Sequence, residues 1–230
     1  FQRELGVSPQ AVALNQRLLF ARKLLAETAL PLTEVAYASG FGSVRRFNSA
    51  VRAQFRLAPG DMRRLQGGGN RTADMQLQLQ YRPPYNWELV ADFFTRHAIA
   101  GLEEVSDNRY RRYLDIKGRA GSITVSPVPR RNALRLQLDI PDHGQLMQLV
   151  ARIRRMFDLD ANPEAINQVL GQDRYLKPLL KKYPGIRAPG HWSMFESCVR
   201  GVVGQQVSVA AARTVLARLV ACCNPGAEQL

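Results

Sequence analysis

The sequence has few residues of the kinds that build metal centres, disulfide frameworks or membrane spans. Its 230 residues include three cysteines and three histidines, and none has the paired spacing of a zinc or disulfide site. We therefore expect no metal, no cofactor and a reducing compartment. No apolar run reaches the roughly 18 residues that a transmembrane helix needs, and no signal peptide begins the chain. These features predict a cytoplasmic protein without a membrane partner.

Acidic residues are scarce relative to basic ones. Lys and Arg together number 32 against 19 for Asp and Glu, so the formal net charge is +13 at pH 7. Arginine dominates the excess, and its guanidinium suits phosphate groups and base edges better than an ammonium does. Both halves of the chain are basic, which favours a polyanionic partner throughout. A generally basic surface that only keeps the protein soluble is the alternative.

Turn signals and apolar periodicity divide the chain into three parts. Residues 1–66 have helical spacing, and a Gly-Gly-Gly-Asn stretch marks a linker at 67–74. Residues 75–141 combine one helix with several short alternating strands, which is typical of an antiparallel α+β domain. Helical spacing returns over 142–230. The sequence therefore predicts a mixed fold: an all-α module, an α+β domain and a second all-α region.

Two short helices joined by a glycine turn are expected between residues 33 and 55. Gly40 can adopt a positive φ, and Ser43 is placed to cap the second helix. The polar face of this helix mixes the residue types that read the major groove and bind phosphates. An ordinary solvated helix face is the alternative. The candidate DNA-binding residues are Ser43, Val44, Arg45, Arg46, Asn48 and Ser49.

The stretch "LPLTEVAYASGFGSVRRFNSAVRAQFRLAPGDMRR" at 30–64 carries a specific pattern: a Ser-Gly-Phe turn, two aromatic positions in the next helix and a closing Pro-x-x-Met-Arg. It resembles the C-terminal helix-turn-helix of the AraC family of transcription regulators. Val51 stands where that family usually has a phenylalanine, and the family's first helix-turn-helix is almost wholly missing upstream, so we expect weak operator binding. The resemblance implies three base-facing and three phosphate-facing side chains: respectively Val44, Arg45 and Asn48, and Ser43, Arg46 and Ser49.

Three stretches of the second half share another resemblance. They read "LQYRPPYNWELVADFFTRHAIAGLEEV", "RMFDLDANPEAINQVLG" and "IRAPGHWSMFESCVRGVVGQQVSVAAART". These stretches are similar to the AlkA-type DNA-3-methyladenine glycosylase II family. The resemblance implies that 75–141 has the fold of a TATA-binding-protein repeat and that 142–230 begins an all-α domain of the helix-hairpin-helix glycosylase superfamily. A regulator followed by a glycosylase resembles the Ada/AlkA proteins of the alkylation response.

Two adjacent amides, Gln205 and Gln206, stand between two apolar helical runs in "GVVGQQVSV". Burying an amide pair costs free energy unless each donor and acceptor forms a hydrogen bond. The position of these two residues between apolar runs therefore needs an explanation. In the family it resembles, the loop carries a wedge that enters the duplex where a damaged nucleotide is extruded. The resemblance puts Gln206 at the wedge, where the family has an apolar residue, while Gln205 orients the loop and Ser208 caps the next helix. A plain turn exposed to water is the alternative.

The family's base pocket is aromatic, which suits electron-poor alkylated purines. By resemblance Phe93 lies at its edge and Val209 touches the same cleft; core packing is the alternative for Phe93. The family's catalytic Asp follows a glycine hairpin, and neither is found in this sequence, so no catalytic residue is assigned. Three other acids, Asp158, Asp160 and Asp173, are interpreted as capping or surface residues. Whether the chain is an enzyme stays open.

These features together predict a DNA-binding fragment of an alkylation-damage response protein. Its parent would be a transcription regulator fused to a DNA-3-methyladenine glycosylase that excises alkylated bases in base-excision repair. The alternative is a sequence-specific regulator with a non-catalytic C-terminal DNA-binding or sensor module. The expected partner is double-stranded DNA, both operator and alkylated duplex, bound by a monomer associated with the bacterial nucleoid.

Overall fold

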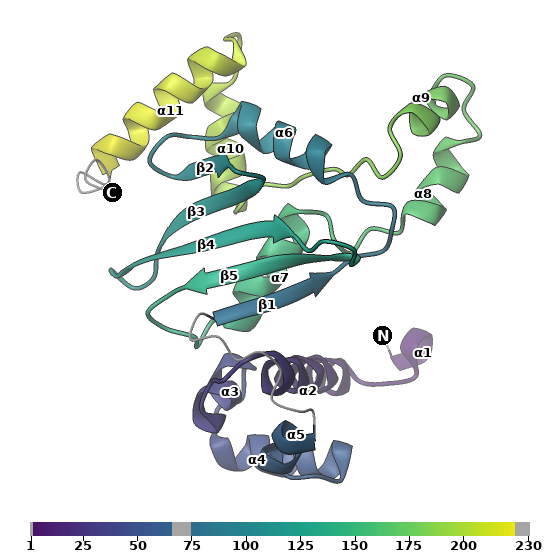
Figure 1. Cartoon of the computed structure of the whole chain (residues 1–230), viewed down its shortest axis with the longest axis vertical. Helices are drawn as coiled ribbons and strands as arrows, with labels where there is room; N and C mark the ends of the chain where they lie inside the picture. The colour runs from purple at the N-terminus through teal and green to yellow at the C-terminus, as the bar shows by residue number, and fades with distance from the viewer. Residues whose placement is uncertain (1, 66–74, 224–230) are drawn as a thin grey trace. The chain divides into compact units, whose positions relative to one another are not determined.

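The computed structural model of the chain describes residues 2–65 and 75–223. The first stretch is helical, and the second holds a five-stranded sheet with further helices (Figure 1). This order confirms the mixed fold expected from the sequence, in which a helical region precedes a sheet domain and helices then return. The linker expected at 67–74 lies outside the described residues.

Contacts within the chain form two compact units. The first consists of residues 1–77 with 139–151, and the second of residues 78–138 with 152–230. Ser8 starts the longest helix of the first unit, because its hydroxyl accepts a hydrogen bond from a backbone N–H of the first turn at 3.2 Å. The helices described before the sheet are α1 (Gln2–Leu5), α2 (Pro9–Glu27), α3 (Leu32–Ala38), α4 (Val44–Phe55) and α5 (Pro59–Leu65).

Helices α3 and α4 form the expected helix-turn-helix. Gly40 joins them with a φ of 80°, a backbone conformation that glycine adopts without the steric cost of a Cβ. Phe47 and Val51 of α4 are fully buried, and the ring of Phe47 meets that of Phe41 edge to face, with 5.5 Å between centroids. Val51 is therefore fully covered by this core although it is smaller than the phenylalanine of the family that the stretch resembles.

A five-stranded sheet lies at the centre of the second stretch. Strand β3 pairs antiparallel with β2 and with β4, where Tyr110 is opposite Val125 and Arg112 is opposite Ile123. These four side chains are buried, so the register places Tyr110 and Arg112 on the core face of the sheet. The strands, in spatial order, are β1 (Met75–Gln80), β5 (Ala133–Asp139), β4 (Ala120–Pro127), β3 (Arg109–Asp115) and β2 (Glu103–Ser106).

Helix α6 (Trp87–His97) packs on that core face through aromatic rings. The ring of Phe94 lies 4.8 Å from Tyr110 and 4.9 Å from Phe157, and Trp87 stacks on Phe157 at 6.1 Å between centroids. Aromatic pairs at such distances contribute about 0.5–1.5 kcal/mol each beyond the area that they bury. This aromatic cluster fixes α6 against β3, and the C-terminal end of α6 then leads towards the candidate site.

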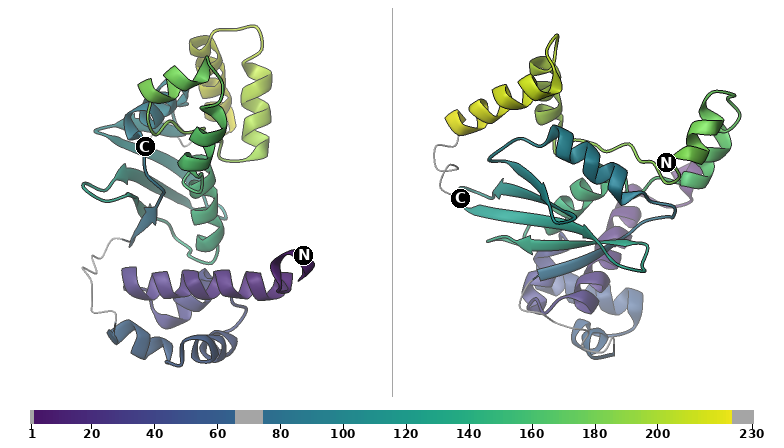
Figure 2. Two further views of the ribbon diagram at one scale, coloured as in Figure 1. Left: turned by 90° about the vertical axis from the view of Figure 1, so that its right-hand side faces the viewer. Right: turned by 45° about the horizontal axis from the view of Figure 1, so that its top comes forward.

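Helices α10 and α11 meet at a turn, which lies at the top of Figure 1 and of the right-hand view in Figure 2. No residue of α10 is buried, and three of its apolar side chains are open to solvent: Met194 and Phe195 are each 80% exposed and Val202 is 67% exposed, whereas Val199 and Val203 are half-buried. None of the helices in the two described stretches is long and apolar enough to cross a membrane. The helices after the sheet are α7 (Leu146–Met156), α8 (Pro163–Leu170), α9 (Leu176–Lys182), α10 (Met194–Val203) and α11 (Val209–Cys223).

Candidate nucleic-acid interface

The six helix-turn-helix candidates lie together on the first two turns of α4. Arg45, Arg46 and Ser49 are exposed, and the other three are half-buried. The Ser43 hydroxyl accepts a hydrogen bond from the backbone N–H of Arg46 at 3.3 Å, which confirms the expected N-cap. Because a hydroxyl also donates, the capping group keeps a proton for an acceptor outside the protein.

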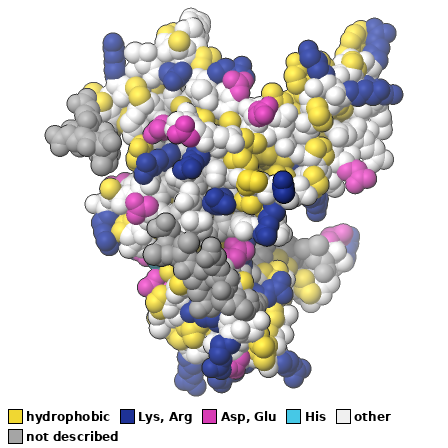
Figure 3. Space-filling model, in the orientation of Figure 1, with side chains coloured by type: hydrophobic (Ala, Val, Ile, Leu, Met, Phe, Trp, Pro, Cys, Tyr) yellow, Lys and Arg dark blue, Asp and Glu magenta, His cyan; other side chains and the backbone are white. Residues whose placement is uncertain are grey.

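The start of α4 has an unusual charge distribution. Acidic residues are favoured in the first turn of a helix, where they offset the positive end of the helix dipole, but this turn has none and instead carries Arg45 and Arg46. The two guanidinium groups therefore add to the positive field of the helix end. In Figure 3 basic side chains gather over the end of the first unit that α4 and α5 form. Such a concentration of positive charge fits an anionic ligand better than it fits helix stability.

The second candidate is the turn between α10 and α11. Gly204 ends α10 by donating from its backbone N–H to the Arg200 carbonyl at 2.9 Å. Ser208 accepts from the backbone N–H of Ala211 at 3.2 Å, which confirms that it caps α11. Gln205 and Gln206 are both exposed, so the free-energy cost of burying an amide pair does not arise here. The turn projects beyond both helices, and water reaches the two amides.

The backbone of Gln206 favours a role for its side chain. Its φ is 57°, in the left-handed region, which costs a non-glycine residue about 1–2 kcal/mol. Glycine would form the same turn without this cost. Six other described non-glycine residues also have a positive φ, so this conformation makes Gln206 a candidate for a functional role without assigning one. The exposure of the two amides by itself also fits the alternative, a plain turn that contacts only water.

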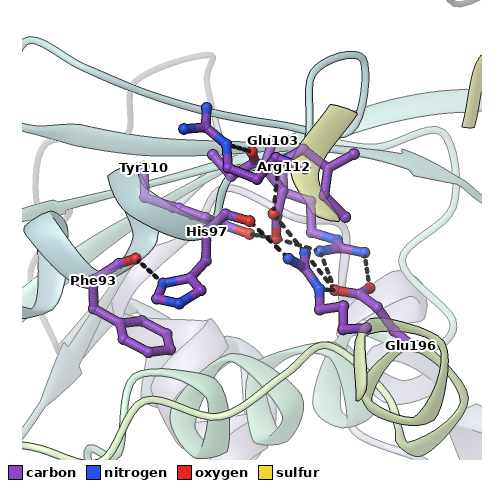
Figure 4. Close-up of polar contacts among 10 residues, drawn as sticks. Phe93, His97, Glu103, Tyr110, Arg112 and Glu196 are labelled. Atoms are coloured by element: carbon purple, nitrogen blue, oxygen red, sulfur yellow. Dashed lines mark hydrogen bonds and ion pairs between the residues drawn. The ribbon is translucent and has the colours of Figure 1, made fainter. Parts of the chain in front are cut away.

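Phe93 lies on α6 at the edge of a small cavity. Its ring stacks on the His97 imidazole at 4.4 Å and meets Phe94 edge to face at 5.5 Å. The His97 Nδ1 donates to the Phe93 carbonyl at 2.7 Å, which holds the two rings together (Figure 4). Phe94 fills the core, whereas Phe93 is half-buried and is left at the cavity edge. The described residues that line this cavity are Phe93, Phe94, His97, Glu103, Met156, Gly190, His191, Glu196 and Arg200.

Val209 is not among the described residues that line this small cavity. It is 51% exposed at the start of α11. Glu196 and Arg200 are the residues of α10 that line the cavity. Beyond Arg200 the helix continues away from the cavity, with a rise of about 1.5 Å per residue, until it ends. The turn and Val209 beyond it therefore lie farther along the axis than the cavity.

Four charged side chains at this cavity were not predicted from the sequence. Glu103 of β2, Arg112 of β3, and Glu196 and Arg200 of α10 form a closed ring of ion pairs, which we call the charged ring (Figure 4). Around it the N–O distances are 2.7 Å from Arg112 to Glu103, 2.5 Å from Arg112 to Glu196, 2.8 Å from Arg200 to Glu196 and 2.7 Å from Arg200 to Glu103. It joins the sheet to α10.

Further hydrogen bonds reach the charged ring, although the buried Nε of Arg112 has no hydrogen-bond partner among the described residues. The Tyr110 hydroxyl donates to Glu103 at 2.8 Å, and Arg200 donates to the His97 carbonyl at 2.7 Å. Burial alone would raise the pKa of Glu196, but Arg112 and Arg200 outweigh it, so the pKa is lowered. The carboxylate is thus charged at neutral pH. Two arginines and two glutamates balance, as buried charges require.

Part of this arrangement had a signal in the sequence. Arg112 follows Tyr110 by two residues in "RYRRYL", so strand alternation puts both on one face of the sheet. Glu196 and Arg200 are spaced i and i+4, which places them on one face of a helix. No local sequence pattern predicts that Arg112 of the strand pairs with Glu196 of the helix, because the two residues are 84 positions apart.

The three aspartates of the helical region have the structural roles expected. Asp158 accepts from the Ala188 backbone N–H at 3.1 Å, and Asp160 pairs with Arg154 at 2.5 Å. Asp173 caps the start of α9 by accepting from two backbone N–H groups. Within residues 2–65 and 75–223, no group of three or more His, Cys, Asp or Glu side chains is arranged to hold a metal ion.

Comparisons with known proteins find relatives for both halves of the chain. A family model described as the AlkA N-terminal domain matches residues 76–193, and one described as a helix-turn-helix domain matches residues 1–65. A protein of Mycobacterium tuberculosis, named probable bifunctional transcriptional activator/DNA repair enzyme AlkA, is 39% identical over 225 residues, which cover 96% of this chain and 45% of that protein. DNA-3-methyladenine glycosylase 2 of Escherichia coli is 34% identical over 141 residues, which cover 61% of this chain and 48% of the relative.

A solved structure supports the fold. The 3-methyladenine DNA-glycosylase from Archaeoglobus fulgidus superposes with a TM-score of 0.53 at 21% sequence identity, covering 62% of this chain and 48% of that one. At this identity the likeness shows the fold alone. The chain spans about half the length of the curated relatives that it matches.

Proposed function

Since the chain belongs to the family defined by the AlkA N-terminal domain, preceded by an AraC-type helix-turn-helix, we propose that it is the duplex-binding part of a bifunctional alkylation-response protein. The whole protein would regulate transcription and excise alkylated bases such as 3-methyladenine. The observation that carries this proposal is the presence, in one chain, of two features suited to duplex DNA. One is the arginine-rich start of α4, and the other is the exposed turn that holds Gln206.

The first feature would bind operator DNA in the major groove. Arg45 and Asn48 are the residue types that form paired hydrogen bonds with guanine and adenine edges, each worth about 1–3 kcal/mol of discrimination. Val44 suits the thymine methyl. Ser43, Arg46 and Ser49 would contact phosphates, which fix the register of the helix and make binding salt-dependent.

The second feature would open the base stack at a lesion. Extruding a nucleotide costs a few kcal/mol of stacking and pairing, and a side chain that fills the gap recovers part of this. The Gln206 amide has both a donor and an acceptor, so it can also hydrogen-bond the unpaired partner base. Gln205 would orient the turn, and Phe93 would stack on the edge of the extruded base.

Excision itself would belong to the whole protein. Loss of an alkylated base leaves an electron-poor sugar that a carboxylate must stabilise, and Asp158, Asp160 and Asp173 are engaged in hydrogen bonds and an ion pair within the chain. We assign no catalytic residue among the described residues. The helix-turn-helix at residues 1–65 also supports a second candidate, a sequence-specific regulator whose C-terminal part binds DNA without catalysis.

Domain limits and setting complete the proposal. Residues 1–66 would form the regulator module, 75–141 the sheet domain and 142–230 part of the helical glycosylase domain. With duplex DNA as its partner, the protein would act as a monomer at the bacterial nucleoid in the cytoplasm.

Binding of matched duplexes tests the wedge. The 230-residue chain is titrated by fluorescence anisotropy into a plain duplex and into one holding a tetrahydrofuran abasic-site analogue. Gln206→Ala is expected to lose most of the preference for the analogue, and the neighbouring exposed Gln205→Ala serves as a control with a smaller effect. Equal preference in Gln206→Ala and wild type would remove Gln206 from the wedge role. Failure of the wild-type chain to bind any duplex at low salt would remove both features.

A further inference from the structure

We propose that the charged ring of Glu103, Arg112, Glu196 and Arg200 positions the α10–α11 turn, so that Gln206 is held at the place where it enters the duplex. These four are positioning residues that act through Gln206 and touch no nucleotide themselves. The inference rests on the proposed wedge function of the turn and adds what fixes the wedge relative to the sheet domain.

Polar contacts fix α10 on the sheet more than apolar burial does. No residue of α10 is buried, and Met194, Phe195 and Val202 are mostly exposed. By contrast the side chains of Glu196 and Arg200 are only 14% and 11% exposed, because they face the sheet. Val199 and Val203 are half-buried as well, but the ion pairs that join α10 to the sheet come from its two charged residues.

Ion pairs that are also hydrogen bonds fix the relative orientation of two side chains as well as the distance between them. Arg112 binds both Glu103 and Glu196, and Arg200 binds the same two carboxylates from the other side. Each residue of the charged ring thus has two charged partners, and no single one can shift without breaking two links. Apolar contacts of similar area tolerate sliding, whereas charge-assisted hydrogen bonds restrict distance and angle.

Arg200 connects the charged ring directly to the turn. Its side chain reaches Glu103 and the His97 carbonyl, while its backbone carbonyl accepts the hydrogen bond from Gly204 that ends α10. Gly204 is one helical turn further on, a rise of about 6 Å. A tilt of α10 at Arg200 would therefore carry Gln206 with it.

The same residue also connects to Phe93 at the edge of the small cavity. The carbonyl that Arg200 binds belongs to His97, whose ring stacks on Phe93 at 4.4 Å. Glu196 and Arg200 line the cavity next to Phe93. The charged ring thus fixes the wedge turn and the pocket edge to one another, as coordinated extrusion of a base requires.

The test uses local unstacking of DNA as its readout. The whole 230-residue chain is mixed with a duplex that holds a tetrahydrofuran abasic-site analogue, with 2-aminopurine as the base opposite it. The fluorescence of 2-aminopurine rises when the base is unstacked. The variants are Glu196→Gln, Arg200→Lys, Gln206→Ala and the double variant Glu196→Gln/Gln206→Ala. Asp160→Asn is the matched control, since it breaks an exposed ion pair outside the charged ring.

We expect Glu196→Gln to reduce the fluorescence rise about fivefold, to the level of Gln206→Ala, and the double variant to lose nothing more, because coupled residues are not additive. Asp160→Asn and the binding of a plain duplex should change less than about twofold. Circular dichroism checks that each variant is folded. If Glu196→Gln does not fold, Arg200→Lys decides, since it keeps the charge but cannot span Glu103, Glu196 and the His97 carbonyl together.

Two results would overturn the inference. One is a wild-type fluorescence rise in a folded Glu196→Gln or Arg200→Lys chain, and the other is an additive loss in the double variant. Either leaves the wedge itself intact as long as Gln206→Ala is impaired. An unimpaired Gln206→Ala chain would instead overturn the wedge function, and this inference with it.

Discussion

The guanidinium of Arg112 lies over the indole ring of Trp192, 4.6 Å from its centroid. Arg152 also lies over this ring, at 4.8 Å, so one tryptophan contacts two arginines. The Arg112 side chain is only 4% exposed, and desolvated cation–π contacts are stronger than exposed ones. Trp192 thus fixes the plane of the guanidinium that joins Glu103 to Glu196.

Replacing this ring should destabilise the sheet domain. Trp192→Leu is expected to lower the free energy of unfolding by about 2 kcal/mol or more, since it removes a desolvated cation–π contact together with buried aromatic area. Tyr113→Leu is the control, because Arg111 lies over Tyr113 at 5.3 Å on the exposed side of the same strand. That variant should lose less than about 1 kcal/mol. Urea denaturation followed by circular dichroism measures both, and equal losses would contradict the argument.

Acid should weaken the charged ring through Glu196. Arg112 and Arg200 hold the pKa of this carboxyl below its ordinary value of 4.5, in spite of its burial. A group with a lowered folded pKa stabilises the fold above its unfolded pKa, and this contribution is lost as the pH falls through the folded value. The stability difference between wild type and Glu196→Gln should therefore be constant from neutral pH down to about 5 and should shrink below 4.5.

Denaturation of the two proteins across this range measures the difference directly. Carboxylates outside the charged ring titrate as well, but their surroundings are the same in both proteins, so their effect cancels. A difference that grows on acidification would show that Glu196 is protonated in the folded state and would reverse the sign of the pKa shift.

The sequence predicts where the two serine-capped helices begin, whereas it does not predict the charged ring. Ser43 and Ser208 stand directly before apolar helical spacing, so the local pattern alone indicated both caps, and the structure confirms them. Whether Gln205 and Gln206 are buried could not be predicted, since a pattern of apolar neighbours does not show that a turn projects into solvent. Arg112 and Glu196 come together only through the packing of α10 on the sheet, which no local rule specifies.

Substitutions at Ser43 should separate capping from DNA binding. Ser43→Ala removes the hydrogen bond to the Arg46 N–H and should cost about 1 kcal/mol of stability as well as DNA affinity. Ser43→Asp keeps an N-cap and favours the helix dipole, so its stability should be within about 0.5 kcal/mol of wild type. Its negative charge at the proposed phosphate contact should nevertheless weaken duplex binding more than Ser43→Ala does.

Thermal unfolding and anisotropy titrations give the two quantities for each variant. Ser49→Ala is the control, because Ser49 is exposed and forms no cap, so it should lose affinity without losing stability. Tighter duplex binding by Ser43→Asp would remove the start of α4 from the proposed interface.

Replacing each of two glycines of the second unit by alanine should change the free energy of unfolding in opposite directions. Gly185 has a φ of 75°, and a Cβ there would lie 2.8 Å from the Tyr85 backbone N and 2.9 Å from that of Asn86, while its own carbonyl accepts from the Asn86 N–H at 2.9 Å. Neither strain nor clash can be relieved without moving backbone, so Gly185→Ala should cost about 3 kcal/mol or more. Gly201 lies within α10, where a Cβ meets nothing within 4 Å. Gly201→Ala should therefore stabilise the chain by about 0.5–1 kcal/mol through helix propensity, and urea denaturation showing a loss there would mean that α10 is not helical at this position.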